Sequence, residues 1–351
     1  MMIKKITIIN FKSLKNVQLD LGKFNLLCGT NASGKSSLIQ AILLMAQNMD
    51  ESEDIVLNGE LLSLGEFIET KNFDASIDVP VSITLEDCAD TSSVLKFNQD
   101  EIIERSVMYP RINNQLYYLS ANRIGNADVF ERASRKNVFG LLGEYAISFL
   151  NDNYDTPMPE NLIFDNEQET AHVFSDEVNY WMKRITGSTL KVDKVQKTNK
   201  LVLSYSNNKN YQVRTCNTGS GLSYVVSIII LGLGVGLLGE GLDKKPVVII
   251  ENPEIHLHPK AQATLTEFLA WLSNYMQIII ETHSDHIFNG FRKMIKQEKL
   301  NVESSNIFFF NLENNATSIK KIEISPNGKL LTMEKDLFDQ FQIDLSELLR
   351  K

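Results

Sequence analysis

Cysteine is scarce in this sequence, which has only Cys28, Cys88 and Cys216 among its 351 residues. The three lie far apart and match neither a disulfide framework nor the spacing of zinc ligands, which excludes a small disulfide-stabilised scaffold and a zinc finger. Widely spaced thiols are typical of a reducing compartment, so a cytoplasmic location is expected. The chain also opens without a basic and then apolar leader, so secretion is not expected.

An excess of positive charge is also lacking. The sequence has 35 Lys and Arg against 44 Asp and Glu, a formal net charge of −9, which argues against a surface coated with nucleic acid. The charge is unevenly distributed: residues 50–104 hold 15 Asp and Glu against two lysines, whereas residues 183–214 hold eight Lys and Arg against Asp193 alone. The basic segment is interpreted either as a solvated face or as a surface for nucleic acid or an acidic partner.

One long stretch, from Leu222 to Gly239, lacks any charge. Its 18 residues are long enough to be a candidate for a membrane span. However, four glycines interrupt it, and its flanks lack the Lys and Arg bias of a spanning helix. We therefore expect a buried helix beside a parallel sheet, and no membrane association.

A glycine-rich loop stands between an apolar strand, Phe24 to Cys28, and an apolar helix that follows Ser36. The loop reads Gly29-x4-Gly34-Lys35-Ser36, the pattern of a phosphate loop. Glycines allow the tight turn that aims several N–H groups and a helix N-terminus at one anion. The lysine can reach β- and γ-phosphates, and the serine hydroxyl can ligate Mg²⁺. The sequence therefore predicts ATP binding by Asn31, Gly34, Lys35, Ser36 and Ser37.

The segment Asn10-Phe11-Lys12-Ser13 lies between two expected strands, close upstream of this loop. Its aromatic ring and its lysine are candidates for contacting a base or a phosphate. An edge turn with a solvated lysine explains the same spacing equally well, and the sequence alone does not decide between these interpretations.

A short strand, Tyr117 to Leu119, leads to Ser120-Ala121-Asn122-Arg123. Arg123 is a candidate for contacting a phosphate or a partner.

A second set of polar residues follows two buried strands. Pro246 to Ile250 ends in Glu251-Asn252-Pro253-Glu254, and Gln277 to Ile280 ends in Glu281-Thr282-His283-Ser284-Asp285. A carboxylate at the end of a buried strand is where a phosphate-loop ATPase holds Mg²⁺. Upstream, the glycine-rich Thr218 to Ser223 opens the long apolar helix and offers a second helix N-terminus to a phosphate.

This ordered set of motifs resembles ABC-type ATPases of the SMC and RecF branch, and most closely the OLD-like ATPases of anti-phage systems. The resemblance spans nearly the whole chain. It implies an ABC-type P-loop ATPase head of the α/β class that forms a homodimer around shared nucleotide. Lys35, Ser36 and Glu251 would then hold Mg·ATP, with Ser36 and Glu251 as metal ligands. Ser220 and Gly221 of the other protomer would cap the γ-phosphate, and His283 would be the switch histidine.

The chain departs from the family pattern in three places. The position of the usual catalytic glutamate is Asn252, so the expected catalytic set is Glu251, Asn252, Glu254 and His283. No long coiled coil separates the two groups of motifs. No glycine-and-carboxylate nuclease domain follows His283, so a nuclease or toxin effector is expected to be a separate protein.

Three alternatives remain open at this stage. The cluster of His256, His258, His283 and His286 with nearby carboxylates can be interpreted as a metal-hydrolase site, because His-x-His can ligate Zn²⁺. The chain can also serve as an assembly switch that holds ATP with negligible turnover, or as a RecF-like DNA-repair ATPase.

The expected architecture is a mixed N-terminal β lobe and a largely parallel core sheet with a helical insertion. We expect four ranges: an N-terminal ATPase lobe, an insertion that is helical over 138–185 and a basic β meander over 186–214, a C-terminal ATPase lobe, and a final strand with an acidic helix. Their bounds are 1–98, 99–215, 216–312 and 313–351.

Overall fold

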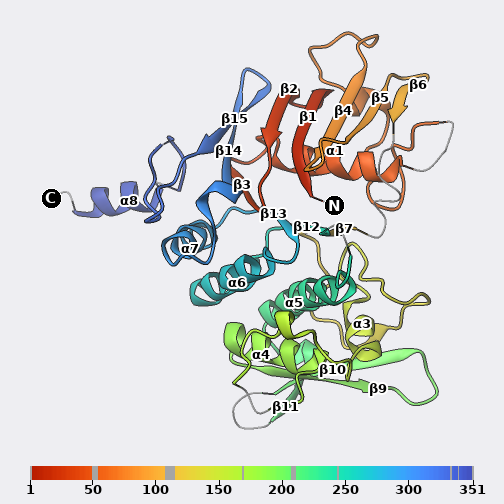
Figure 1. Ribbon diagram of the computed structural model, residues 1–351, viewed down its shortest axis with the longest axis vertical. Helices are drawn as coiled ribbons and strands as arrows, with labels where there is room; N and C mark the ends of the chain where they lie inside the picture. Colours follow the sequence, from red (N-terminus) through yellow and green to blue (C-terminus); the bar gives the residue numbers. More distant parts are fainter. Residues whose placement is uncertain are drawn as a thin grey trace. The chain divides into compact units, whose positions relative to one another are not determined.

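The computed structural model describes residues 2–49, 54–106, 115–167, 170–206, 211–242, 245–332, 334–338 and 340–349. The chain forms two compact units, each built from separate stretches of sequence (Figure 1). Unit 1 comprises Met1–Leu116, Glu281–Asp285 and Arg292–Lys351, and unit 2 comprises Tyr117–Ile280 and His286–Phe291. Both units mix helices with sheets, as expected for the α/β class.

Unit 1 begins with an antiparallel five-stranded sheet in the order β2-β1-β4-β5-β6. Alternating apolar residues produce it, because every second side chain of a strand faces the same side. Ile6 and Ile8 of β1 align with Leu85 and Ile83 of β4, and all four side chains are fully buried. The strands are β1 (Ile3–Phe11), β2 (Leu14–Asp20), β4 (Val81–Asp87), β5 (Ser92–Phe97) and β6 (Ile102–Ser106).

The second set of strands in unit 1 carries the phosphate loop. β3 (Phe24–Gly29) lies parallel to β14 (Ser305–Glu313), which pairs in antiparallel fashion with β15 (Ala316–Ile322). The first five residues of β3 and the first six of β14 are buried, as continuous apolar runs in parallel strands require. The helices are α1 (Lys35–Gln47), α2 (Phe67–Thr70), α7 (Asp285–Lys296), whose two ends belong to this unit, the short η4 (Val302–Ser304) and α8 (Gln340–Leu349).

Unit 2 is built around the apolar helix α5 (Ser220–Leu238). The helix is long and apolar enough to cross a membrane, but 72% of its apolar window is buried inside the protein, which confirms the expected buried helix. Two of its glycines allow close packing, since a Cβ at Gly232 would lie 2.4 Å from Leu272 and one at Gly234 2.7 Å from Phe149. The helices around it are α3 (Ala146–Asp152), α4 (Phe174–Thr186) and α6 (Pro259–Leu272), and β13 (Gln277–Glu281), β12 (Val247–Glu251) and β7 (Leu116–Leu119) are neighbouring strands in that order.

The basic segment forms an antiparallel sheet in unit 2, as the alternating pattern predicted. β10 pairs with β9, β11 and β8 and turns Leu201, Leu203 and Tyr205 into the core. Lys209 lies outside the described residues. The strands are β8 (Phe130–Glu131), β9 (Thr189–Lys194), β10 (Lys200–Ser206) and β11 (Gln212–Arg214), and two short 3₁₀ turns are η2 (Glu160–Leu162) and η3 (Thr215–Asn217).

One helix boundary differs from the sequence prediction. The insertion was expected to be helical from residue 138, but its first helix, α3, begins only at Ala146. Gly140 and Gly143 have φ angles of 77° and 72°, in the left-handed region. Such conformations end a right-handed helix, so the residues before Ala146 form turns instead.

Candidate functional site

The phosphate loop of unit 1 runs from the end of β3 to the start of α1, and its two glycines are structurally required. Gly29 has a φ angle of 144°, and a Cβ there would lie 2.0 Å from the Phe310 carbonyl oxygen. Gly34 has a φ angle of 100°, and a Cβ there would lie 2.3 Å from the Thr317 hydroxyl. Any larger residue would therefore have to displace β14 or β15.

Lys35 is the first residue of α1 and is 3% exposed. Its Nζ donates to the carbonyl oxygens of Thr30 (2.7 Å) and Gly29 (3.2 Å) in the same loop. Burial lowers the pKa of this amine, and the Glu281 carboxylate opposes the change. The lysine is thus held inside the loop, where an incoming phosphate would replace the carbonyl oxygens as its partner.

Ser36 lies next to a carboxylate that the sequence analysis did not assign to the site. Its hydroxyl lies 3.0 Å from each carboxylate oxygen of Glu281, the last residue of β13. Glu281 is 5% exposed and Ser36 is exposed, so the pair reaches from the core to the loop surface. Hydroxyl and carboxylate oxygens are the ligands that Mg²⁺ prefers, so Ser36 and Glu281 fit a magnesium ion.

The turn after β1 supports the loop from the other side. The Thr317 hydroxyl of β15 lies 2.7 Å from the Ser13 hydroxyl and 2.9 Å from the Ser33 carbonyl oxygen. Lys12 donates to Gln40 of α1 at 2.7 Å. Phe11 is fully buried, so the expected contact between its ring and a base is not available: the ring belongs to the core.

His283, Asn31 and Ser37 are at least partly exposed in unit 1. Desolvation, and secondarily the positive charge of Lys35, lower the pKa of the imidazole. A lowered pKa favours the neutral imidazole, and a neutral imidazole has one N–H donor to offer a phosphate. Asn31 is exposed and Ser37 is half-buried, so both remain open to a ligand.

The carboxylate turn of unit 2 follows β12. Glu251 ends the strand, and Asn252 adopts a left-handed φ angle of 41° before Pro253 reverses the chain. The Arg123 guanidinium holds this turn, donating to the carbonyl oxygens of Glu251 (2.6 Å) and Asn252 (2.8 Å). The Ala121 amide donates to the Glu251 carboxylate at 3.2 Å.

Arg123 was expected to contact a phosphate or a partner, but its side chain is 2% exposed. Burial lowers the pKa of the guanidinium to about 10, and Glu254 is the first of the charges that oppose the change. The two terminal nitrogens of Arg123 donate to three backbone carbonyl oxygens, and only its buried Nε has no hydrogen-bond partner among the described residues. The structure therefore corrects this expectation, because Arg123 supports the turn and is not open to a ligand.

The glycine-rich start of α5 lies against the same turn within unit 2. A Cβ at Gly221 would lie 2.4 Å from the His256 carbonyl oxygen. The rings of Tyr224 and His256 are 5.0 Å apart between centroids. Ser220 and Gly221 are half-exposed, and no side chain caps the N-terminus of the helix. Free N–H groups at a helix start attract anions, and the capping role of Ser220 and Gly221 stays a prediction.

The histidines do not assemble a metal site. Among the residues that the structure describes, no group of three or more His, Cys, Asp or Glu is placed to hold a metal ion. His258 instead caps α6 by accepting a hydrogen bond from the Lys260 amide at 3.3 Å. The metal-hydrolase alternative therefore has no ligand set in the described part of the chain.

The predicted residues thus fall into two groups. Lys35, Ser36 and His283 lie in unit 1 with Glu281, while Glu251, Asn252 and Glu254 lie in unit 2 with the start of α5. The sequence analysis missed the contact of Glu281 with Ser36, although the position of Glu281 at the end of a buried strand was a usable signal. Nothing in the sequence pointed to Thr317, because its role depends on β15 crossing next to the loop.

Comparisons with known proteins identify the family. A family model described as an AAA ATPase domain matches residues 1–141 and 160–288. No curated protein sequence matches the chain. The fold is similar to the Smc head domain of Pyrococcus furiosus, with an extended coiled coil and bound to the C-terminal domain of ScpA, at 12% identity and a TM-score of 0.57, covering 99% of this chain and 100% of that one.

A second structure, an SmcHead bound to the C-winged helix domain of ScpA, has a TM-score of 0.51 at 12% identity, covering 92% of this chain and 98% of that one. The likeness to Smc heads shows the fold, and the family match covers the phosphate loop, the carboxylate turn, the start of α5 and His283. The chain therefore belongs to the AAA ATPase domain family and has the mixed α/β fold of SMC-head P-loop ATPases.

Proposed function

We propose that this protein binds Mg·ATP in the phosphate loop and hydrolyses it. The observation that carries the proposal is the pairing of Ser36 with Glu281, next to a buried Lys35 that has only loop oxygens as hydrogen-bond partners. A serine and a carboxylate in this arrangement supply oxygen ligands for Mg²⁺, and the lysine supplies the charge for the β- and γ-phosphates.

In this mechanism each residue has one task. The first N–H groups of α1 and Lys35 bind the phosphates, while Ser36, with Glu281 or Glu251, would hold Mg²⁺, which would supply positive charge to the transferred phosphoryl group when bound. His283 donates to the γ-phosphate. Asn252 can orient the attacking water but cannot take its proton near neutral pH. Glu254, two residues later, is therefore proposed as the base.

The exposed start of α5 supports a nucleotide shared between two copies of the chain. One chain needs one cradle for the γ-phosphate, and the loop before α1 already supplies it. The uncapped N-terminus at Ser220 and Gly221 is a second anion site. We propose that it caps the nucleotide of a second protomer and that ATP thereby drives homodimer formation.

We also propose that the dimer controls a separate effector protein, a nuclease or a toxin, in cytoplasmic defence against phage, as OLD-like ATPases do. The similar Smc head of Pyrococcus furiosus carries the C-terminal domain of ScpA, which supports the idea that a head of this fold can present a partner-binding surface. A RecF-like role in DNA repair and an ATP-held switch with negligible turnover are the alternatives.

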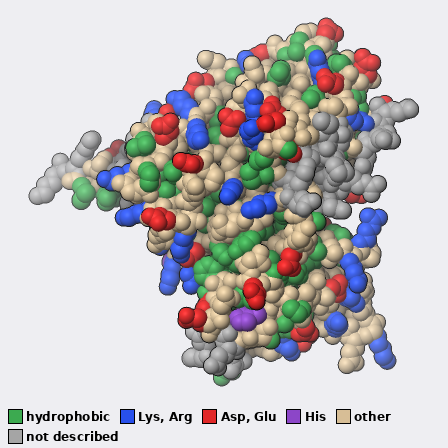
Figure 2. Space-filling view, in the orientation of Figure 1, with side chains coloured by type: hydrophobic (Ala, Val, Ile, Leu, Met, Phe, Trp, Pro, Cys, Tyr) green, Lys and Arg blue, Asp and Glu red, His purple; other side chains and the backbone are tan. Residues whose placement is uncertain are grey.

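One surface of unit 2 favours nucleic acid as an additional partner. The tip of the β9–β10 hairpin is joined to the loop that follows β8, because the amide of Arg132 donates to the Asn199 carbonyl oxygen at 3.1 Å. The structure thereby brings together two basic segments that join at Arg132 and Asn199, which are 67 residues apart in sequence. Figure 2 shows Lys and Arg side chains along this edge of unit 2. We call the exposed cations Arg135, Lys136, Lys194, Lys197 and Lys200 the basic tip.

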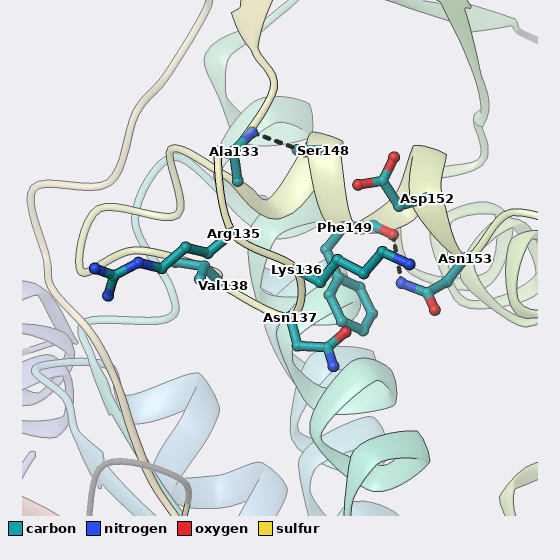
Figure 3. Close-up of a pocket in the computed structure, with 9 residues that line it drawn as sticks. All are labelled: Ala133, Arg135, Lys136, Asn137, Val138, Ser148, Phe149, Asp152 and Asn153. Carbon is teal, nitrogen blue, oxygen red and sulfur yellow. Dashed lines mark hydrogen bonds between the residues drawn. The ribbon is translucent and has the colours of Figure 1, made fainter.

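The basic tip adjoins a small pocket of about 70 Å³ (Figure 3). Such a volume is far below the roughly 300 Å³ of a small-molecule site, so the pocket cannot hold a nucleotide. Arg135 and Lys136 point in opposite directions from its rim, with Lys136 extending toward Asn153. In the described residues 130–138 and 189–206, both aromatic side chains, Phe130 and Tyr205, are buried. Phosphate contacts without base stacking therefore favour a duplex backbone over a single strand.

Two measurements test the nucleotide proposal. Phosphate release should be Mg²⁺-dependent, and light scattering should show a dimer with ATP and a monomer without nucleotide. A chain that neither binds nor hydrolyses ATP would end the proposal. Turnover of a stable dimer far below the usual rate of about 1 s⁻¹ would favour the switch alternative.

The basic tip has its own test. The binding constant for duplex DNA should fall with salt with a slope of about −4.5 in log K against log salt concentration, because roughly five phosphates are neutralised. The triple change Lys194→Glu, Lys197→Glu and Lys200→Glu should abolish this binding, whereas Lys293→Glu, Lys296→Glu and Lys299→Glu, on exposed lysines elsewhere, should not. Absence of binding by the unmodified chain at low salt would make the tip a solvated or protein-facing surface.

A further inference from the structure

Arg123 has an environment that no binding role explains. The side chain is 2% exposed, yet its guanidinium donates to three backbone carbonyl oxygens, those of Ser120 (3.0 Å), Glu251 (2.6 Å) and Asn252 (2.8 Å). Burying a cation costs free energy unless its donors are satisfied. Arginine reaches the Glu251 and Asn252 carbonyl oxygens from two separate nitrogens held in one rigid plane, whereas lysine would have to use a single nitrogen. The geometry therefore suits an arginine.

The carbonyl groups that Arg123 holds belong to the proposed catalytic turn. Glu251 carries a carboxylate that the Ala121 amide also contacts, and Asn252 is held at a φ angle of 41°. This conformation is accessible to asparagine but is sparsely populated. Because the two carbonyl oxygens share one guanidinium, Arg123 fixes the direction in which the side chains of Glu251 and Asn252 leave the backbone.

The other side of Arg123 faces the start of α5. The Tyr224 ring lies 5.8 Å from the guanidinium and 5.0 Å from the His256 ring. Gly125 packs against the same tyrosine, since a Cβ there would lie 3.0 Å from its ring. The first turns of α5, the loop around Arg123 and the carboxylate turn are therefore packed together through one aromatic ring.

Hydrogen bonds reinforce this packing next to the same residues. Ser223 of α5 donates to the Asn126 side chain at 2.8 Å, and Asn126 donates to the Thr218 carbonyl oxygen at 3.0 Å. Gly221 touches the backbone of His256 directly. Displacing the N-terminus of α5 would thus move the carboxylate turn with it, because tightly packed elements transmit shifts rather than absorb them.

We infer that Arg123 is a positioning residue for ATP hydrolysis, and that Arg123 and Tyr224 couple the phosphate-capping start of α5 to the Glu251–Glu254 turn of the same protomer. Binding of the start of α5 to the nucleotide of a second copy would thereby align the turn for hydrolysis of the protomer's own ATP. The inference rests on the proposed ATPase function and assigns the coupling within one protomer to Arg123 and Tyr224.

Arg123→Lys tests the positioning role, because lysine keeps the positive charge but lacks the planar guanidinium with its separate N–H donors. The variant should lower kcat at least tenfold, while KM for ATP stays within about twofold, since Lys35 and Ser36 are untouched. Its dependence on ATP concentration should also lose the sigmoidal shape expected of the unmodified chain. Arg292→Lys is the matched control, because Arg292 also donates to a backbone carbonyl oxygen, that of Gly328, at 3.0 Å.

Tyr224 tests the coupling separately. Tyr224→Phe keeps the ring and should retain sigmoidal kinetics, whereas Tyr224→Leu should give a hyperbolic dependence on ATP. If Arg123→Lys folds poorly, the alternative is Arg123→Ala assayed with and without millimolar guanidinium chloride. Recovery of kcat with guanidinium but not with ammonium chloride supports positioning by the planar guanidinium.

The outcomes separate the two proposals. Arg123→Lys with unchanged kcat, or a hyperbolic ATP dependence of the unmodified chain, overturns this inference while leaving the ATPase in place. An unmodified chain that binds no ATP overturns both.

Discussion

Ser36 and Glu281 are 245 residues apart in the sequence, yet the serine hydroxyl lies 3.0 Å from both oxygens of the glutamate carboxylate. The pair brings a buried negative charge to the first turn of α1, directly after Lys35. The same carboxylate opposes the loss of the positive charge of Lys35, whose pKa is lowered by burial. One glutamate thus serves both the cation of the loop and the proposed metal ligand.

Glu281→Gln should raise the Mg²⁺ concentration needed for ATP turnover at least tenfold, or about 1.4 kcal/mol. The reason is that an amide oxygen binds Mg²⁺ more weakly than a carboxylate does. A Mg²⁺ titration of phosphate release measures the effect. Glu303→Gln, on an exposed side chain of the same unit, is the control, and equal Mg²⁺ dependence of both variants would remove Glu281 from the metal site.

Lys35→Ala should weaken ATP binding at least tenfold, again about 1.4 kcal/mol, because the cation that faces the β- and γ-phosphates is lost. Isothermal titration measures the dissociation constant. Lys15→Ala serves as the control, since Lys15 forms an ion pair with Asp74 at 2.6 Å at the surface. Unchanged affinity of the Lys35 variant would refute the phosphate-loop assignment.

Ser220→Arg should leave ATP binding intact and block the dimer, because a bulky cation would occupy the free start of α5. Light scattering with ATP should show a monomer, and turnover should fall at least tenfold. Ser76→Arg, at an exposed position of unit 1, should still dimerise. If each chain hydrolyses ATP alone, both variants will behave like the unmodified chain.

The identity of the base can be tested by exchanging functional groups at Asn252 and Glu254. We expect Glu254→Gln to trap an ATP-bound dimer, because the proposed proton acceptor is lost. Single-turnover assays should be compared with those of Asn252→Glu. If Glu254→Gln hydrolyses like the unmodified chain and Asn252→Glu is much faster, Glu254 is structural and the protein is a slow clamp.

The lowered pKa of His283 predicts that the stability of the nucleotide-free protein depends on pH. Desolvation and Lys35 lower its pKa below the ordinary 6.5, so the unfolded chain binds the proton more tightly than the folded one. The contribution of His283 to the free energy of unfolding is therefore fully present above pH 6.5, and it is lost as the pH drops through the pKa of the folded state. Melting temperatures measured between pH 5 and 8 should show this loss. His283→Asn should flatten the curve, and an unchanged slope would assign the effect to other groups.

The local sequence pattern was sufficient to predict the strands and helices that carry the motifs. The strand from Phe24, the turn at Gly29 and the helix after Ser36 lie where their periodicity and glycines predicted. The strand that ends at Glu251 and the helix that begins at Ser220 were equally clear, because apolar runs and glycine punctuation are local signals.

Contacts between distant segments could not be predicted in the same way. The sequence analysis treated Phe11 as a candidate for contacting a base. Spacing along the chain could not show that its side chain is fully buried. The sequence analysis also treated Arg123 as a candidate for contacting a phosphate. In the structure it donates to the carbonyl oxygens of Glu251 and Asn252, which are 128 and 129 residues away in sequence. No sequence pattern indicated that the chain returns from unit 2 to unit 1 at Glu281.

The contact of Thr317 with Ser13 and Ser33 has a practical consequence for fragment design. The family match ends at residue 288, whereas the threonine hydroxyl that touches the phosphate loop belongs to β15, beyond that limit. A recombinant chain cut at the end of the match would keep every motif residue and lose β14, which pairs with β3, as well as β15, whose threonine contacts the phosphate loop. We expect such a fragment to hold ATP more weakly than the full chain, although every residue proposed to bind phosphate is still present.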